Sequence, residues 1–436
     1  ERDKIIDWFS PLNFFLRQAD IFSTRQPGTG GWLLEHKLFK KWKSGKGKTL
    51  WCRGMPGAGK TVLASIVVDH LREALDSQSI AVAVIYINHQ ETEAQTFSNL
   101  LAGLWRQLVV RKPISSAVSE LYEKHREQRT RPSLAEVDFI LCSTLSEHSN
   151  VFIVVDAIDE YPEQQRHILL RHLSSLTPAW TVNLMLTSRP HLNIKHVVEN
   201  FDTLEIRATE DDIRRHVEAE TLKSSRLSRH IENRPDLRKE IETIIVRRSD
   251  GMFLLAKLHI ESLATKHTIN AVRVALADMP RDLKSTYDEV VDRINRQSED
   301  DKKLAWHTIS WVTRAKRPLR PTELREALAV QSGAIKLDPD DLLDMDTILS
   351  VCAGLVVINQ ADKRIRLIHY TMKTYFNDAQ AATFPHSSTE IATICITYLS
   401  FDIFSHHIDD PMSLFRQYSF LDYAVEYCLV HARGRP

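Results

Sequence analysis

Short apolar runs alternate with amphipathic stretches between residues 47 and 208. The runs Ile80–Ile87 and Val151–Val155 are apolar at every position. Runs of this kind, when helices separate them, are typical of strands in a parallel sheet that is covered on both faces. We therefore predict an α/β fold here. The predicted strands are 49–52, 80–87, 151–155, 183–186 and 203–206, and the predicted helices are 61–75, 97–110 and 134–145.

From Glu210 onward the apolar residues recur with the period of an α-helix. A break at Ser249-Asp250-Gly251 and another around Pro280 divide this region. We therefore predict a purely helical domain after the α/β fold. Its predicted helices are 211–222, 236–247, 252–265, 270–277 and 282–296.

The pattern changes again near Asp300. Pro321 stands just before a helical stretch, which predicts that Thr322 is the N-cap of that helix. Two short apolar runs that flank a polar turn are the signature of a β-hairpin. Helices followed by a hairpin indicate a winged-helix domain, and the tail after it is predicted to be helical. The elements of this domain are helices 301–313, 323–330 and 346–352 and strands 355–358 and 365–368.

Composition narrows the class of protein. The chain has 436 residues, enough for two to four domains of roughly 100–200 residues each. Lys plus Arg and Asp plus Glu both number 57, and this balance argues against a surface built for polyanions. The 5 cysteines are scattered without a CxxC pair, so we expect neither a zinc site nor a disulfide framework. No apolar run approaches the roughly 18 residues of a membrane span, and we expect a cytoplasmic protein.

The strongest motif lies between the predicted strand 49–52 and the predicted helix 61–75. Residues 54–61 read GMPGAGKT, which matches the P-loop pattern G-x-x-x-x-G-K-[ST]. Its glycines let backbone N–H groups wrap phosphate oxygens, and the following helix adds its positive N-terminus. Lys60 would reach the β- and γ-phosphates, and the Thr61 hydroxyl would ligate Mg²⁺. The predicted nucleotide-binding residues are Gly54, Pro56, Gly57, Ala58, Gly59, Lys60, Thr61 and Val62.

A second motif ends the strand 151–155. Asp156 follows this apolar run directly, which is the Walker B pattern. The strand would carry Asp156 to the edge of the sheet beside the P-loop, where its carboxylate can hold Mg²⁺. Asp159 and Glu160 lie just beyond it, and either could orient the attacking water as a catalytic base. The sequence leaves open which of the two is the base.

A third motif, Thr187-Ser188-Arg189-Pro190, ends the predicted strand 183–186. An arginine at this place would lie near the γ-phosphate and neutralise its developing charge. We therefore expect Arg189 to act in catalysis.

Together these motifs resemble the NACHT-type ATPase core of the STAND class of P-loop switches. The segment Gly28–Leu34 resembles the region before the P-loop in fungal NACHT receptors, and residues 250–256, 367–372 and 421–424 resemble their later domains. One departure is that Gly251-Met252-Phe253 lacks the Gly-x-Pro turn by which NB-ARC relatives touch the nucleotide. The resemblance implies an N-terminal nucleotide-pocket segment (1–46), a NACHT P-loop domain (47–208), a helical domain (209–280), a winged-helix domain (281–380) and the start of a second helical region (381–436).

The resemblance also implies a function. In this class ADP holds a closed monomer, exchange for ATP opens it and permits oligomerisation, and slow hydrolysis resets it. His369 would then reach the β-phosphate of ADP in the closed state. The resemblance further implies a segment of a larger protein, with an effector before Glu1 and a repeat domain after Pro436 that reads an unknown ligand. Fungal innate immunity, incompatibility or regulated cell death would be its setting.

One alternative stays open at this point. A winged helix can also belong to an ATP-responsive regulator that binds DNA. Basic residues lie before and in the predicted helix 323–330, although that helix itself carries two Glu and one Arg, and a recognition helix should be basic along one face. The basic residues are Arg314, Lys316, Arg317, Arg320 and Arg325.

Overall fold

A computed structural model describes most of the chain and divides it into two compact units. The first unit holds residues 1–223 together with 249–256, and the second holds residues 224–248 together with 257–436. The described residues are 1–74, 80–88, 91–110, 112–179, 182–190, 192–331, 333–359, 362–369, 371–378, 388–404 and 411–433.

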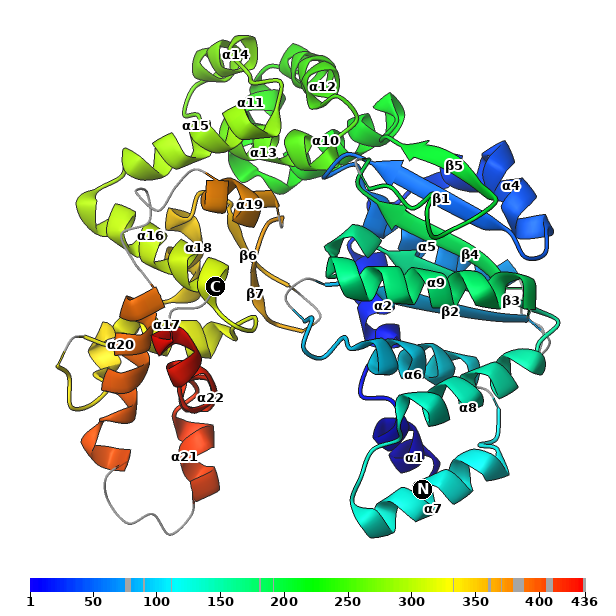
Figure 1. Cartoon of the computed structure of the whole chain (residues 1–436). Coiled ribbons are helices and arrows are strands. Elements are labelled where there is room, and N and C mark those ends of the chain that lie inside the picture. Colours follow the sequence, from blue (N-terminus) through cyan, green and yellow to red (C-terminus); the bar gives the residue numbers. More distant parts are fainter. Residues whose placement is uncertain are drawn as a thin grey trace. The chain divides into compact units, whose positions relative to one another are not determined.

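A five-stranded parallel sheet forms the centre of the first unit, and its strand order is β2-β3-β4-β1-β5 (Figure 1). The central position of β1 and β4 buries them on both faces, and every residue of β4 is buried. The α/β fold predicted for this part is thereby confirmed. The strands are β1 (Thr49–Gly54), β2 (Ile80–Tyr86), β3 (Asn150–Asp156), β4 (Val182–Ser188) and β5 (Phe201–Ile206).

Helices cover both faces of this sheet. The connection from β1 to β2 runs through α5, and the connection from β3 to β4 runs through α9 in the opposite direction across the sheet. Right-handed crossovers therefore place α5 and α9 on opposite faces, as Figure 1 shows. The helices of the first unit are α1 (Arg2–Phe9), α2 (Phe14–Ser23), α3 (Gly31–Glu35), α4 (Lys37–Ser44), α5 (Lys60–Ala74), α6 (Phe97–Leu108), α7 (Ser116–Gln128), α8 (Leu134–Ser146), η1 (Ile158–Glu160), α9 (Glu163–Ala179) and α10 (Glu210–Lys223).

The register of the sheet brings the ends of three strands to one level. Val155 of β3 pairs with Leu186 of β4, so the next residues lie side by side: Asp156 at the end of β3, and Thr187 one residue before the end of β4. Arg53 of β1 pairs with Ser188 of β4. The P-loop after β1, the acidic turn after β3 and the segment after β4 consequently meet at one edge of the sheet.

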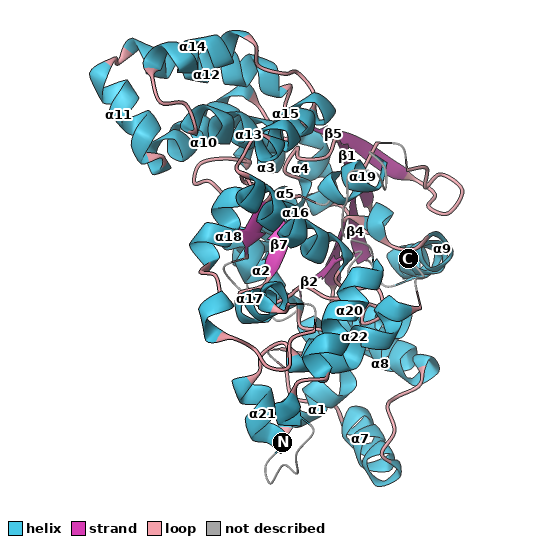
Figure 2. Cartoon of the chain, turned by 90° about the vertical axis from the view of Figure 1, so that its left-hand side faces the viewer, coloured by secondary structure: helices cyan, strands magenta, loops and turns pink. Residues whose placement is uncertain are grey.

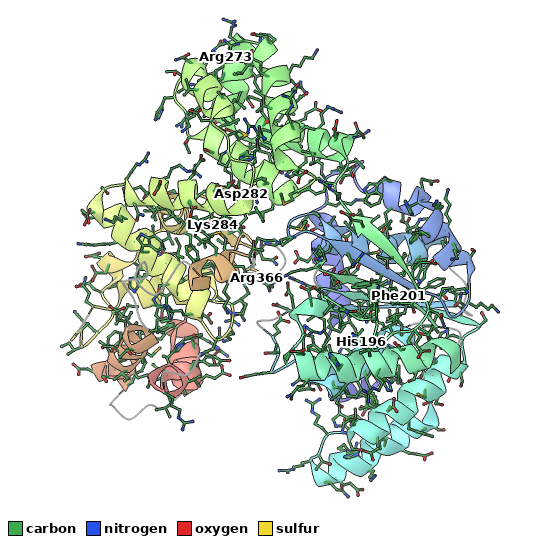
Figure 3. The ribbon with its side chains drawn as sticks, turned by 45° about the horizontal axis from the view of Figure 1, so that its top comes forward. His196, Phe201, Arg273, Asp282, Lys284 and Arg366 are labelled. Atoms are coloured by element: carbon green, nitrogen blue, oxygen red, sulfur yellow. The ribbon has the colours of Figure 1, made fainter. Side chains whose placement is uncertain are left out.

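Among its described residues the second unit is helical apart from one hairpin, whose two short strands are magenta in Figure 2. Side chains tie its helices together: Arg273 of α14, labelled in Figure 3, bonds to Glu240 and Asp236 of α12. The elements are α11 (Ser225–Asn233), α12 (Asp236–Ser249), α13 (Phe253–Ala264), α14 (Ile269–Ala277), α15 (Leu283–Asn295), α16 (Glu299–Arg314), α17 (Pro321–Ala329), η2 (Pro339–Asp341), α18 (Met345–Val351), β6 (Val356–Ile358), β7 (Ile365–Leu367), α19 (Thr371–Asp378), α20 (Ser388–Leu399), η3 (Asp402–Phe404), α21 (Pro411–Gln417) and α22 (Leu421–Ala432).

The predicted hairpin forms, since β6 and β7 pair antiparallel. The predicted cap of the helix before it is wrong. Helix α17 begins at Pro321, and its N-cap is Arg320, whose backbone N–H donates to the Glu323 carboxylate at 2.7 Å. Proline suits the first helical position because its missing N–H has no partner there in any helix. Thr322 therefore lies inside the helix.

The tail is anchored to α17 by a buried acid. Glu326 accepts hydrogen bonds from the backbone N–H groups of Ser419 and Phe420, both at 3.0 Å, and from the Tyr398 hydroxyl. These bonds join α20 and the start of α22 to the winged-helix region.

The domain boundaries inferred from the sequence stay predictions. The compact units follow a different division, because α10 groups with the sheet, as does the short stretch Ser249–Ala256. Among the described residues, no helix combines the length and the apolar character that crossing a membrane requires.

Candidate nucleotide site

The P-loop joins β1 to α5, and two of its glycines adopt a backbone that side chains disfavour. Gly57 has φ 75° and Gly59 has φ 90°. A Cβ atom on Gly57 would lie 2.5 Å from the Cβ of Leu254, and one on Gly59 would lie 3.1 Å from the Phe253 ring. The loop is therefore built tightly against the first residues of α13, and only glycine fits at these two positions.

Lys60 opens helix α5 and turns back over the loop. Its Nζ donates to the carbonyl oxygens of Gly54 at 2.8 Å and Met55 at 3.1 Å. Burial lowers the pKa of the Lys60 ammonium, while the nearby carboxylates of Asp156 and Asp159 oppose this shift. The amino group is thus held where the loop's N–H groups would receive phosphate oxygens.

Asp156 lies at the end of β3 and is only 2% exposed. The Thr187 hydroxyl donates to its Oδ1 at 2.6 Å, and the Thr61 side chain also bonds to it. Burial raises the pKa of the Asp156 carboxyl, and these two hydrogen bonds oppose that rise. A carboxylate and a hydroxyl in contact are hard oxygen donors, which are the ligands that Mg²⁺ prefers. Thr61 and Asp156 therefore fit a magnesium site.

The chain turns sharply after Asp156. Ala157 has φ 55° and ψ 43°, a left-handed conformation that costs most side chains roughly 1–2 kcal/mol. Its backbone N–H donates to the Thr187 hydroxyl oxygen at 2.9 Å. The turn leads directly into η1, which carries Asp159 and Glu160.

Asp159 and Arg189 form a pair. The Asp159 Oδ1 accepts the backbone N–H of Arg189 at 3.1 Å, and its Oδ2 lies 3.0 Å from the Arg189 Nε. The Asp159 side chain is only 6% exposed. Both carboxylate oxygens of Asp159 thus face Arg189.

A largely apolar cavity of about 130 Å³ adjoins the P-loop. Ala58, Gly59 and Val62 line one side of it, and Phe253 of α13 lines it as well. Residues of the N-terminal segment, including Gly30 and Trp32, complete the wall. Because its walls are apolar, the cavity suits a flat heterocycle rather than phosphates.

Several residues around this site were not expected from the sequence. Phe253 occupies the place of the proline in the Gly-x-Pro turn of NB-ARC relatives. Because that proline is missing, the sequence predicted no contact with the nucleotide site here. Asp212 of α10 is buried and accepts the backbone N–H of Gly30 at 3.2 Å, which fixes the wall of the cavity. Thr187 is part of a quoted motif, but its hydrogen bonds depend on strand register. Only the resemblance of segments 28–34 and 250–256 pointed toward this region.

The structure brings together the P-loop residues with Asp156, Asp159, Glu160 and Arg189. His369 belongs to the second unit. There its Nδ1 accepts the backbone N–H of Thr371 at 3.3 Å, and it lies 2.8 Å from the Thr371 hydroxyl oxygen at the start of α19. Its contact with a nucleotide stays a prediction.

Two family models match the chain. Residues 28–189 match the model described as Nephrocystin 3, N-terminal, and residues 291–386 match the model described as GPI inositol-deacylase, winged helix domain. The first match contains the first two motifs of the site and the third as far as Arg189. The second contains α16 to α19 and the hairpin.

Two curated proteins are similar in sequence. The vegetative incompatibility protein HET-E-1 of Podospora anserina is 21% identical over 364 residues, which are 79% of this chain and 25% of that protein. The azaphilone pigments biosynthesis cluster protein L of Monascus ruber is 23% identical over 184 residues, or 38% of either chain. The chain therefore spans well under half of the length of both relatives.

Solved structures with a similar backbone fold include the Aeropyrum pernix Orc1 protein in complex with DNA. It is 18% identical with a TM-score of 0.35 and covers 84% of this chain and 93% of that chain. The Cdc6p protein of Pyrobaculum aerophilum is 15% identical with a TM-score of 0.34 and covers 85% and 90%. Scores this low carry no argument about function.

The sheet order, the P-loop and the acid at the end of β3 define a P-loop NTPase of the α/β class. The two family models and the similarity to the Podospora protein narrow the class of P-loop NTPase further. These similarities support a NACHT-type NTPase with a winged-helix domain.

Proposed function

We propose that this chain is a nucleotide-dependent switch of the STAND class, which binds ADP and ATP with Mg²⁺ and hydrolyses ATP slowly. The observation that carries this proposal is the meeting of Lys60, Asp156 and Arg189 beside a cavity that Phe253 helps to line. Phosphates would lie in the P-loop, and the base would enter the cavity. Since Ala58 and Gly59 line both places, one nucleotide spans them.

The adjoining charges suggest distinct roles for the two acids after β3. Asp159 accepts from the backbone of Arg189 and pairs with its side chain, so its role is to position Arg189. Glu160 is then the general base that orients the attacking water. Arg189 would neutralise charge that develops on the γ-phosphate. Thr61 and Asp156 would hold Mg²⁺, whose charge stabilises the phosphate oxygens.

Helix α13 supports a role in switching. Its first residues, up to Ala256, group with the sheet, and the residues from Lys257 onward group with the second unit. The Leu254 backbone N–H donates to the Gly57 carbonyl at 3.3 Å, so the helix begins on the P-loop. If the bound nucleotide changes the conformation of the P-loop, the start of α13 would move with it, and this helix continues into the second unit.

The biological setting is proposed from the relatives. The name of the Podospora protein refers to vegetative incompatibility. By that similarity, this chain would act in fungal innate immunity, incompatibility or regulated cell death in the cytoplasm. Its activated form would associate with itself. The full-length protein would also read an unknown ligand through a domain outside these residues.

The structure of α17 does not favour the DNA-binding alternative. Glu323 and Glu326 are buried on this helix, at 1% and 7% exposure. Arg317 is bound to Glu323 and Asp422, and Arg325 donates to the Leu343 carbonyl at 2.6 Å. Two of the basic residues that would contact phosphates thus serve the fold of the domain itself.

Calorimetric titration of the chain with ADP, ATP and GTP in the presence of Mg²⁺ tests the proposal. We expect ADP and ATP to bind and Lys60→Ala to lose measurable affinity, because the variant lacks the ammonium on the phosphates. Lys46→Ala is the matched control, since Lys46 is exposed and precedes β1. Wild-type protein that binds no adenine nucleotide, or Lys60→Ala protein with unchanged affinity, would refute the nucleotide site.

A further inference from the structure

One hydroxyl connects the two functional parts of the site. Thr187 lies one residue before the end of β4, beside Asp156, and is only 1% exposed. Its Oγ1 donates to the Asp156 Oδ1 at 2.6 Å and accepts the Ala157 backbone N–H at 2.9 Å. A hydroxyl has one hydrogen, so the donor bond goes to the carboxylate and a lone pair receives the amide. Both partners constrain the same oxygen.

The two bonds have different consequences. The bond to Asp156 fixes the orientation of a carboxylate that has almost no contact with solvent. The bond to Ala157 stabilises a left-handed residue, a conformation that persists only where its surroundings enforce it. That residue directs the chain into η1, where Asp159 meets Arg189 and Glu160 follows.

The next residue offers a comparison. Ser188 is also fully buried, and its hydroxyl accepts the Trp51 Nε1–H at 2.9 Å and donates to the Arg189 carbonyl at 2.9 Å. These two bonds hold the ends of β1 and β4 together, and neither involves Asp156 or η1. Two buried hydroxyls therefore stand next to each other in sequence with different partners.

We infer that Thr187 is a positioning residue for the nucleotide reaction: its hydroxyl sets the magnesium carboxylate and the turn that carries the base at the same time. This inference rests on the proposed nucleotide function and adds a residue to it. It implies that removal of one neutral hydroxyl impairs magnesium-dependent binding and hydrolysis together.

Three variants test the inference. Thr187→Val keeps the branched shape without the hydroxyl, Thr187→Ser keeps the hydroxyl, and Ser188→Ala removes the neighbouring one. Two quantities are measured: the gain in ADP affinity on addition of Mg²⁺, by calorimetry, and kcat and KM for ATP. Thermal melting shows whether each variant is folded.

For Thr187→Val we expect a roughly 10- to 100-fold lower kcat, the usual effect of losing a hydrogen bond to a charged group. Most of the gain in ADP affinity from Mg²⁺ should also be lost, while ADP affinity without Mg²⁺ stays within about twofold of wild type. Thr187→Ser should recover both quantities, and Ser188→Ala should retain them.

Several results would overturn the inference. A Thr187→Val protein with wild-type kcat and magnesium response would do so, and so would a Thr187→Ser protein as impaired as the valine variant. Equal losses in Ser188→Ala would show a general effect on the strand ends. If Thr187→Val does not fold, Thr187→Ala, which also lacks the hydroxyl, is measured in its place. A wild-type protein that binds no ADP would remove the proposed function itself, whereas normal wild-type activity with an inert Thr187→Val change removes only this inference.

Discussion

Buried carboxylates occur in both units of the molecule, and their surroundings differ. Asp156 in the first unit is 2% exposed and receives hydrogen bonds from two hydroxyl groups. Glu323 in the second unit is 1% exposed, but Arg317 lies 2.9 Å from it and Arg364 lies 3.6 Å from it. Two hydroxyl groups orient the first acid, with the Lys60 ammonium nearby, whereas two arginines neutralise the second.

This difference separates a site from a structural element. An acid that only hydroxyls orient keeps its negative charge available for a cation, although burial makes that charge unfavourable. An acid paired with guanidinium groups has its charge neutralised within the fold. The same arginines also bond to Asp422 of α22 and to the Pro318 carbonyl, so the pair stabilises the contacts of α17 with the hairpin and with α22. We therefore expect changes at the first to affect the reaction and changes at the second to affect stability.

The largest effect is expected at Glu160. Glu160→Gln should lower the rate of ATP hydrolysis by roughly 100- to 10,000-fold and leave ATP binding intact, because the amide cannot act as a base. Single-turnover hydrolysis and calorimetry measure the two quantities. Asp159→Asn is the matched control and should instead weaken the hold on Arg189. The roles are exchanged if Asp159→Asn abolishes hydrolysis while Glu160→Gln turns over normally.

The reverse outcome is expected at Glu323. Glu323→Gln should reduce the free energy of unfolding of the second unit by about 3 kcal/mol, because it removes the buried charge that the half-buried Arg317 and Arg364 share, although Arg317 keeps its bond to Asp422. Urea unfolding measures this loss, and the exposed Glu299 provides the control variant Glu299→Gln. Asp156→Asn should cost less than about 1 kcal/mol by the same measurement, because no arginine depends on it. A large loss there would remove the distinction between the two acids.

Two buried histidines make the second unit sensitive to acid. Burial lowers the pKa of His259 to about 4 and that of His431 to about 4, from an ordinary value of 6.5. The folded state disfavours their protonation, so stability is full above pH 6.5 and is lost as pH falls toward 4. At pH 5 each of the two histidines should lower the free energy of unfolding by roughly 2 kcal/mol relative to its value above pH 6.5. Urea unfolding of wild type at pH 7 and pH 5 measures this loss.

The variant His259→Gln is the control for this pH effect. Glutamine does not titrate, so the variant should lose about half of the pH dependence that the two histidines supply. An unchanged slope between pH 7 and pH 5 would show that His259 titrates normally in the folded protein.

The smallest effect is expected at Ala157. Its left-handed backbone disfavours β-branched side chains, so Ala157→Val should destabilise the first unit by roughly 1–2 kcal/mol. Ala157→Gly should be neutral or slightly stabilising because glycine adopts this conformation freely. Thermal melting compares the two variants, and equal melting temperatures would show that the turn after Asp156 carries no strain.

Much of the first unit was predictable from local patterns. Apolar runs identify the strands, and a parallel sheet brings the residues after each strand to one edge. The sequence therefore predicted that Lys60, Asp156 and Arg189 lie close together. The pairing of Asp159 with Arg189 depends on register and side-chain direction, which a pattern does not contain. The second unit was less predictable in detail, because a helical period does not show which faces meet. The burial of Glu323 and Glu326 on a helix of mixed polarity is an example.

Packing between distant segments also escaped the sequence. Phe253 lies against Gly59 because α13 begins on the P-loop, and no local signal announces that contact. The wall formed by Gly30 likewise depends on the carboxylate of Asp212, 182 residues later in the chain.

The central claim is that bound nucleotide controls the state of the protein. Sedimentation velocity of the Glu160→Gln chain, in saturating ADP and in saturating ATP with Mg²⁺, tests it most directly, because hydrolysis is blocked in this variant. We predict a monomer in ADP and a faster-sedimenting assembly in ATP. Identical sedimentation in the two nucleotides, with binding of both shown by calorimetry, would contradict the account.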